Sequence, residues 1–246
     1  MKQKNSILLV LVGYAIGYAG FEITASLVGD VLDPVNAIIV SSVVLTAIIA
    51  VEVILLKSKL SDIITFLGLG KPSLRSMIFA ILITALLFLC YPLITMITGY
   101  EFFIPGDWLW LAVGVFALHG IAEEVLYRGY LFRHLREGRS FAKAAWMGVL
   151  FFTLAHIPMI FTLGPFVGGT AVMLAVVSSF PLSWLYEKGY NTIWAPAIVH
   201  FSIDTVIPIL AAGNSSGDYQ MAAVLWMGAC MLIPYIAFLM PRRSES

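Results

Sequence analysis

Long apolar stretches, separated by short polar connections, run through the whole chain. A helix that crosses the hydrocarbon core of a bilayer needs about 20 predominantly apolar residues. Eight stretches are of this kind, and we interpret each as a transmembrane helix. Their bounds are Ile7–Val28, Val35–Leu56, Leu74–Ile97, Trp108–Phe132, Phe141–Ile157, Pro165–Tyr186, Asn191–Ala212 and Tyr219–Met240. The pattern therefore predicts an all-α fold, a bundle of eight membrane-spanning helices.

The composition excludes a water-soluble protein. Hydrophobic residues make up 61% of the 246 positions and charged residues 11%, whereas soluble domains contain about 45–50% and about 25%. The mean hydropathy is +0.97. With no internal repeat and no polar segment of domain size, we expect a single transmembrane domain over residues 1–246. A net charge of zero without a long basic run argues against a nucleic-acid partner.

The basic residues predict how the helices are oriented, because short cytoplasmic loops are enriched in Lys and Arg. They lie at the two ends of the chain and at the second, fourth and sixth connections, while the other connections carry acidic residues or no charge. They are Lys2, Lys4, Lys57, Lys59, Lys71, Arg75, Arg128, Arg133, Arg136, Arg139, Lys143, Lys188, Arg242 and Arg243. This alternation predicts that both termini are cytoplasmic, and the short tails favour a prokaryotic plasma membrane.

Several ionisable residues lie within or beside the predicted spans, where an acidic residue costs on the order of 2.5–3.5 kcal/mol on insertion scales. Glu22 and Glu52 lie near span ends, so we expect them to snorkel or to form ion pairs, Glu52 with Lys57. His119 precedes Glu123 by one turn and is expected to pack against it or to hydrogen-bond with it. His134 falls in a basic connection, where we expect it to be solvated.

A second group of ionisable residues falls at one depth in three predicted spans. At a rise of about 1.5 Å per residue, Glu123 lies roughly 15 Å from Arg133, and His156 lies roughly 20 Å from Lys143. By the same measure, His200 and Asp204 lie roughly 13 and 20 Å from the start of their span. Two imidazoles and two carboxylates in one layer favour a shared site over separate polar contacts between helices.

Helix geometry assigns different directions to the two neighbouring glutamates, because consecutive residues point about 100° apart whereas residues i and i+4 share a face. Glu124 and Arg128 are therefore expected to pair, and Glu123 is expected to face a cavity. His200 and Asp204 project together by the same rule. Pro196 and Pro208 flank them and are expected to free the backbone carbonyls of Thr192 and Asp204.

Three motifs appear in order: Glu123-Glu124-Val-Leu-Tyr127-Arg128-Gly129, Phe152-x-x-x-His156 and His200-x-x-x-Asp204. In this set the chain resembles the CPBP (Abi) family, which includes the CAAX prenyl proteases of the Rce1 type and bacteriocin-processing or bacteriocin-immunity proteins. The resemblance implies an intramembrane endopeptidase whose catalytic core is formed by the spans within residues 108–212. It implies that Glu123 and His156 activate water and that the last motif holds the oxyanion. In Rce1 enzymes the last motif ends in Asn, and an ionised Asp204 cannot donate a hydrogen bond.

The residues themselves support hydrolysis of a peptide bond. A carboxylate in a low-dielectric layer suits the role of general base, and an imidazole N–H suits an oxyanion. We therefore predict that Glu123, His156, His200 and Asp204 are catalytic and that Glu124, Arg128 and Phe152 support them, without an obligatory metal. Zinc bound by His156, His200 and a carboxylate is the alternative, since it would leave one position open.

The expected substrate is a peptide precursor or a membrane-anchored protein, reached from the cytoplasmic side of the bilayer. One competing hypothesis is a non-enzymatic membrane adaptor or bacteriocin-immunity protein of the same family. Another is a proton-coupled transporter, because a layer of acids and histidines also describes a proton relay. The sequence does not show whether the substrate is prenylated.

Overall fold

The computed structural model describes residues 6–205 and 217–240. All regular secondary structure in these ranges is helical, and they contain no strand. The longer α-helices are α1 (Ile7–Val28), α2 (Pro34–Ala50), α4 (Leu74–Thr98), α5 (Trp108–Val115), α7 (Phe141–His156), α9 (Gly164–Lys188), α10 (Trp194–Asp204) and α12 (Tyr219–Leu232). The short α-helices are α3 (Ile63–Phe66), α6 (Arg133–Arg136) and α8 (Pro158–Thr162). The π- and 3₁₀-helical segments are η1 (Val51–Leu55), η2 (Leu60–Asp62), η3 (Phe116–Ala122), η4 (Val125–Phe132) and η5 (Ile233–Leu239).

Polar residues fix where several helices begin. Asp33, Ser73, Ser140 and Asp218 each accept a hydrogen bond from a backbone N–H of the first helical turn. Those N–H groups have no partner within the helix, so such a cap stabilises the helix start. The starts of α2, α4, α7 and α12 therefore follow from local sequence, and they agree with the predicted spans to within one residue.

Among the described residues, seven helical stretches are long and apolar enough to cross a membrane. They are Ile7–Val28, Pro34–Leu55, Leu74–Thr98, Trp108–Arg136, Phe141–Thr162, Gly164–Lys188 and Tyr219–Leu239. The protein is therefore an integral membrane protein, and the prediction of an all-helical, multi-pass fold is confirmed for the described ranges. These seven stretches match seven of the eight predicted spans, three of them extended by several residues.

The remaining predicted span, Asn191–Ala212, corresponds to the shorter helix α10. Tyr190 and Asn191 have positive φ angles, which an α-helix does not accommodate, so the helix begins only at Trp194. Pro196 lies in its first turn and Thr192 lies before the helix begins, so the expected effect of Pro196 on the Thr192 carbonyl stays a prediction. Residues 206–216, with Pro208, and the basic residues of both termini lie outside the described ranges, so an eighth span and cytoplasmic termini stay predictions.

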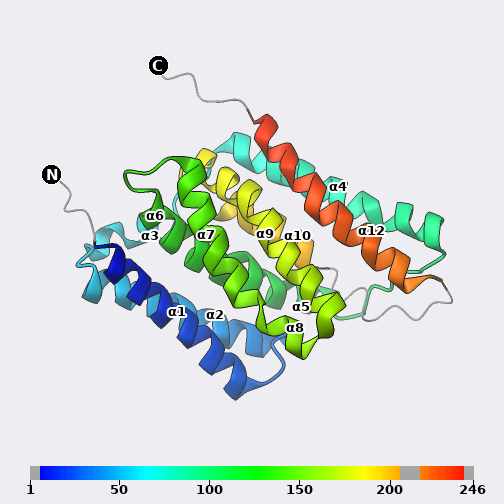
Figure 1. Cartoon of the computed structure of the whole chain (residues 1–246), viewed down its shortest axis with the longest axis horizontal. Coiled ribbons are helices and arrows are strands. Elements are labelled where there is room, and N and C mark those ends of the chain that lie inside the picture. The colour runs from blue at the N-terminus through cyan, green and yellow to red at the C-terminus, as the bar shows by residue number, and fades with distance from the viewer. Residues whose placement is uncertain (1–5, 206–216, 241–246) are drawn as a thin grey trace.

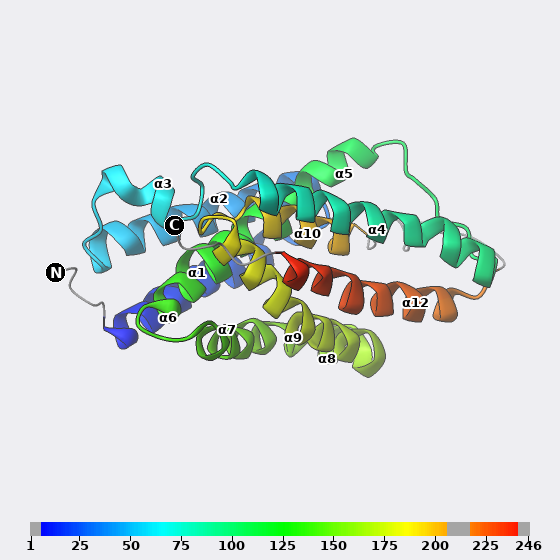
Figure 2. The same ribbon diagram turned by 90° about the horizontal axis from the view of Figure 1, so that it is seen from above.

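Helix α10 lies inside the bundle rather than at its surface (Figure 1). It packs against α4, α9 and η3, and most of its side chains are buried. Helices α4 and α12 run side by side along one flank of the molecule, and α1 and α2 along the other (Figure 2). The residues of α10 are therefore surrounded by protein at the centre of the molecule.

The segment Trp108–Arg136 is one continuous helix, which we call the site helix. It runs through α5, η3, η4 and α6, and the only residues between its two π-helical segments are Glu123 and Glu124. Every residue of η4 is buried. π-Helical turns are rare and occur often at functional sites, because they change the direction of side chains along a helix.

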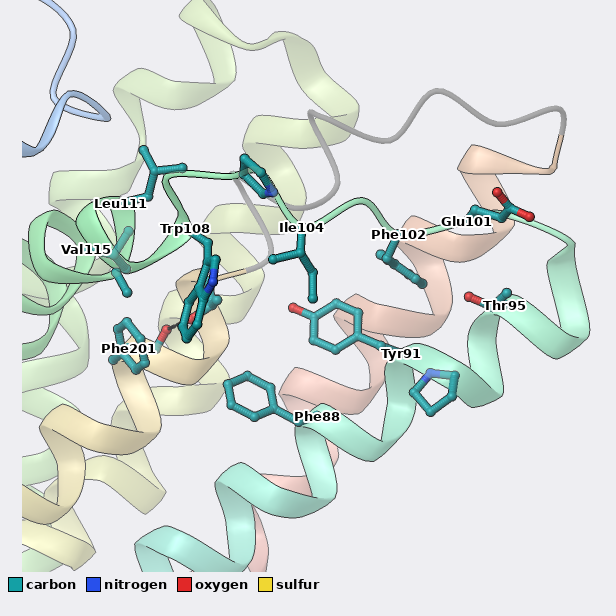
Figure 3. A pocket seen from close by; sticks show the side chains of 14 residues that line it. Phe88, Tyr91, Thr95, Glu101, Phe102, Ile104, Trp108, Leu111, Val115 and Phe201 are labelled. Carbon is teal, nitrogen blue, oxygen red and sulfur yellow. Dashed lines mark hydrogen bonds between the residues drawn. The ribbon is translucent and has the colours of Figure 1, made fainter.

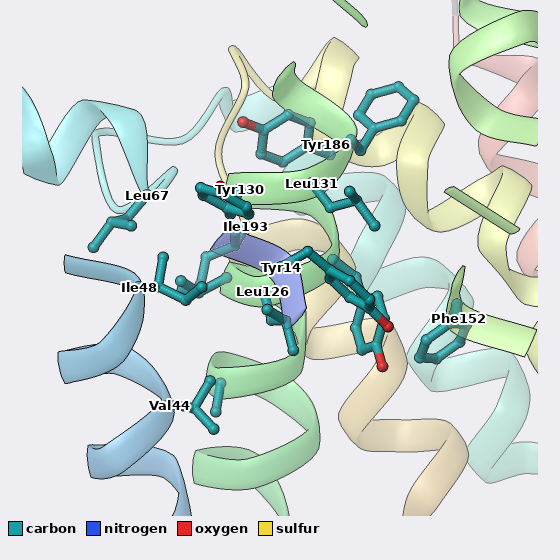
Figure 4. Packing of buried hydrophobic residues seen from close by; sticks show 14 of the residues in the cluster. Tyr14, Val44, Ile48, Leu67, Leu126, Tyr130, Leu131, Phe152, Tyr186 and Ile193 are labelled. Carbon is teal, nitrogen blue, oxygen red and sulfur yellow. The ribbon is translucent and has the colours of Figure 1, made fainter. Parts of the chain in front are cut away.

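Helix α1 approaches the site helix closely at two glycines. A Cβ atom on Gly13 would lie 2.0 Å from the Tyr130 hydroxyl, and one on Gly17 would lie 2.9 Å from Leu126 Cδ1 of the site helix and 2.6 Å from Ile48 Cδ1 of α2. The Tyr130 hydroxyl also donates to the backbone carbonyl of Val10, over 3.0 Å. The two glycines therefore serve packing within the chain, where small residues let transmembrane helices approach. Figure 4 shows the resulting core around Tyr14, Leu126 and Tyr130.

Glu52 and His134 differ from the prediction. Glu52 is fully buried and accepts hydrogen bonds from Arg133 and from the Ser58 hydroxyl (2.7 Å), and His134 Nε2 lies 2.9 Å from its carboxylate. The site helix continues past the predicted end of the span and carries Arg133 and His134 over the end of η1. His134 is therefore buried rather than solvated, and Lys57 is not the partner of Glu52.

Candidate active site

Of the two neighbouring glutamates, Glu124 is the one fully enclosed by protein. Its Oε1 atom lies 2.7 Å from Arg128 Nη1 and 2.7 Å from His200 Nδ1, and the side chain is wholly buried. The contact with Arg128 is the expected i, i+4 pair along the site helix. The contact with His200 joins the site helix to α10. A charge removed from water needs such partners, because an unpaired buried ion is strongly destabilising.

Glu123 is the glutamate that solvent reaches. Its Oε1 atom lies 2.8 Å from His119 Nδ1, and its Oε2 atom lies 3.9 Å from His200 Nε2. Solvent reaches 10% of the Glu123 side chain and 20% of the His119 side chain, but none of Glu124. His119 therefore occupies one carboxylate oxygen of Glu123, and the second oxygen lies toward His200 at a distance longer than a hydrogen bond.

Asp204 completes the contacts of His200. Its Oδ2 atom lies 3.2 Å from His200 Nε2 and 3.8 Å from His119 Nδ1. His200 is thus surrounded by three carboxylates, with Glu124 at Nδ1 and with Glu123 and Asp204 at Nε2. Since an ionised carboxylate only accepts hydrogen bonds, these contacts orient the imidazole and favour protons on both of its nitrogens.

Phe152 stands between the two histidines predicted to be catalytic. The centre of its ring lies 4.6 Å from that of His156 and 5.9 Å from that of His200. His156 Nδ1 lies 2.8 Å from the Phe152 backbone carbonyl, so this nitrogen carries a proton and Nε2 is the free one. His156 is half-buried and lies within electrostatic range of Glu123, but no direct contact joins the two side chains.

Residues 105–206 match the family model for type II CAAX prenyl endopeptidase Rce1-like proteins. The chain carries an Rce1-like core. This match confirms the resemblance drawn from the three motifs, all of which lie within it. No curated protein matches the chain.

The Rce1-like core includes the site helix, α7, α9 and α10, and it leaves out α1, α2 and α4. All the predicted site residues lie in the core, and the structure brings most of them into contact. Glu123, Glu124, Arg128, His200 and Asp204 form one connected cluster, with Phe152 against it and His156 on the far side of that ring. The guanidinium group of Arg128 lies over the Phe152 ring, 4.8 Å from its centre, and this cation–π contact joins the second motif to the same cluster.

Two contacts of the Rce1-like core were not predicted from the sequence. His119 was expected only to support Glu123, yet it also lies beside Asp204 and so links the site helix to α10. The bond between Glu124 and His200 was not predicted at all. The i, i+4 spacing of His119 and Glu123 gave a signal for the first contact, whereas no local signal exists for two residues 76 positions apart.

The described residues offer no group of three or more His, Cys, Asp or Glu side chains arranged to hold a metal ion. The alternative zinc set of His156, His200 and a carboxylate is not among such groups, and zinc binding stays a hypothesis. The Nδ1 atoms of both histidines are engaged, by the Phe152 carbonyl and by Glu124. We derive no catalytic step through a metal.

An apolar pocket of about 810 Å³ borders the Rce1-like core on the side of α4. Phe88 and Tyr91 of α4 face Trp108 of α5 and Phe201 of α10 across it (Figure 3). Phe201 directly follows His200, and its ring packs edge-on against Phe116, 5.7 Å away. The pocket is thus separated from the carboxylate cluster by aromatic side chains.

Proposed function

We propose that the protein is an intramembrane endopeptidase that hydrolyses a peptide bond with a water molecule activated by Glu123. The observation that carries this proposal is the asymmetry of the two glutamates. Glu124 is neutralised and closed off by Arg128 and His200, while Glu123 keeps one oxygen open in a partly accessible space. A general base needs such an open oxygen within reach of water and substrate. The match of this segment to an endopeptidase family supports the same reaction.

In the proposed reaction, the free Glu123 oxygen takes a proton from water while the water oxygen attacks the carbonyl carbon of the peptide bond. The carbonyl oxygen becomes an oxyanion, which needs a hydrogen-bond donor. When the tetrahedral intermediate collapses, the carbon–nitrogen bond breaks and the leaving amine receives the proton from Glu123. His156 presents its free Nε2 from α7 and is proposed to hold the same water.

His200 is the proposed hydrogen-bond donor to the oxyanion, and this role requires a particular protonation of its ring. Its Nδ1 proton points to Glu124, so Nε2 can donate only if the ring carries protons on both nitrogens. We propose that the Asp204 carboxylate accepts the Nε2 hydrogen bond and holds the His200 ring in place before substrate binds, and that the oxyanion becomes the acceptor of this hydrogen bond during the reaction. This role accommodates Asp where Rce1 enzymes have Asn, because the carboxylate then needs no proton to donate.

The proposed substrate is a peptide precursor or a protein anchored in the same membrane, in line with the family description. The alternation of basic residues supports a substrate that arrives from the cytoplasmic side, and the proposed location is a prokaryotic plasma membrane. Whether a prenyl group is required is a matter for experiment.

The test uses purified full-length protein in lipid nanodiscs with two probes. One is a fluorogenic farnesylated CAAX peptide together with its unprenylated version, and the other is a mixture of peptides from a digested proteome, read by mass spectrometry. We expect the wild type to cleave at least one probe, with and without a strong zinc chelator. Folded protein that cleaves neither probe would contradict the proposal and point to an adaptor, and activity lost only with the chelator would contradict the metal-free mechanism.

A further inference from the structure

Hydrolysis within the bilayer requires water to reach Glu123, and this inference rests on that proposed reaction. Helix α1 carries three oxygen-bearing side chains at intervals of four residues, Tyr14, Tyr18 and Glu22. Residues at this spacing lie on one face of a helix. We call Tyr14, Tyr18 and Glu22 the α1 stripe. It lies outside the segment that matches the family.

The inner end of the α1 stripe reaches the active site. Tyr14 is buried, its hydroxyl donates to the backbone carbonyl of Phe151 over 3.3 Å, and its ring centre lies 5.9 Å from that of Tyr127. Tyr127 follows Glu123 by one turn of the site helix, and its ring packs edge-on against Phe152 at 4.5 Å. Tyr14 lies within electrostatic range of Glu123. A chain of polar groups thus begins at the wall of the site.

The outer end of the α1 stripe is open. Tyr18 is half-buried and stacks on Tyr14 with ring centres 6.0 Å apart, and Glu22 follows it by one helical turn on the same face. Glu22 is exposed, and no ion pair of it is found in the part of the chain that the structure describes. A carboxylate exposed to lipid within a span is costly. Water around Glu22 removes that cost.

Helix α1 packs loosely against α7. Helix α1 packs mainly on α2, η1 and η4, whereas its contact with α7 is slight and lies around Tyr14 and Phe151. Irregular or polar groups at membrane depth are tolerated where they line a water-filled space. Neighbouring α1 residues off the stripe, such as Ile16 and Ile23, are exposed and apolar, as a lipid-facing surface requires.

We propose that Tyr14, Tyr18 and Glu22 line a water path along α1 that connects Glu123 with the solvent. Water molecules exchange hydrogen bonds with the two hydroxyls and the carboxylate in turn. The path leaves the site toward the Gly29 end of α1, which the distribution of basic residues predicts to be the outer face. Water and a cytoplasmic substrate would then use separate entrances.

The test is cysteine accessibility in full-length protein in nanodiscs, in a background where Cys90 and Cys230 are replaced by Ala. A water-soluble, lipid-insoluble methanethiosulfonate reacts with the thiolate, and a thiol in apolar surroundings stays protonated and inert. We expect Tyr18→Cys and Glu22→Cys to react at least about tenfold faster than the lipid-facing controls Ile16→Cys and Ile23→Cys.

Equal, slow labelling of Tyr18→Cys and Ile16→Cys would overturn the water path, and so would fast labelling of Glu22→Cys alone. Each variant is first checked for a monodisperse elution profile, and these exposed or half-exposed positions should tolerate the change. Labelling does not depend on cleavage. Fast labelling in a protein that cleaves no peptide would therefore support the path while contradicting the proposed function.

Discussion

Replacement of Glu124 by Gln should weaken both the fold and the reaction, because Glu124 is a structural anion that also orients His200. The amide keeps the shape of the side chain and one oxygen for the bonds of Arg128 and His200, but it removes the charge. Breaking a buried ion pair costs about 3–5 kcal/mol. Arg128 retains its contact with the Phe152 ring, which contributes on the order of 2 kcal/mol when desolvated. We therefore expect a loss of about 3 kcal/mol in the free energy of unfolding.

The effect of Glu124→Gln on the reaction follows from the bond to His200. A hydrogen bond to a charged group contributes about 1.5–3 kcal/mol and a neutral one about 0.5–1.5 kcal/mol. The difference of about 1.4 kcal/mol corresponds to roughly a tenfold fall in kcat. Unfolding is measured by titration with SDS in mixed micelles, and kcat by cleavage of the peptide probe that the wild type accepts.

Glu187 provides a matched control. It pairs with Arg136 at 2.7 Å, the same length as the bond between Arg128 and Glu124, but the side chains are 22% and 38% exposed instead of wholly buried. Exposed pairs contribute about 0–1 kcal/mol. Glu187→Gln should therefore leave stability and kcat close to wild type. If Glu124→Gln resembled Glu187→Gln in both measurements, the assignment of Glu124 as a buried anchor would be refuted.

The remaining predictions concern packing and the role of Asp204. Glu52→Ala should lower the free energy of unfolding by about 3 kcal/mol, because it removes the buried carboxylate that pairs with Arg133. A loss no larger than that of Glu187→Ala would contradict this. Gly17→Ala should cost about 1–3 kcal/mol through overpacking, whereas Gly20→Ala, with its nearest neighbour at 3.6 Å, should be nearly neutral. Asp204→Asn should keep kcat within about tenfold of wild type and Asp204→Ala should not, because Asn still offers His200 an acceptor; equal losses would argue against the ring-holding role.

Local patterns predicted much of this fold for identifiable reasons. Apolar runs gave the starts of the seven membrane-spanning stretches to within one residue, where capping residues such as Asp33 and Ser73 fix them. The pairs of Glu124 with Arg128 and of His119 with Glu123 followed from helical spacing. Both kinds of signal depend only on residues a few positions apart.

The remaining features depend on relations between distant segments. The stretch after Asn191 is as apolar as a lipid-facing span, but its described part, helix α10, is buried among other helices, and the span stays a prediction. Hydrophobicity does not distinguish the two environments. In the same way, the contacts of Glu52 with His134 and of Glu124 with His200 depend on how helices far apart in sequence pack together.

Cleavage by Glu123→Gln is the measurement that tests the central claim most directly. The amide cannot take a proton from water, and loss of a general base typically costs about 10²–10⁴-fold in rate. We predict at least about a 10²-fold fall in kcat, measured on protein that SDS titration shows to be folded. Turnover within about twofold of wild type by a folded Glu123→Gln protein would contradict the account.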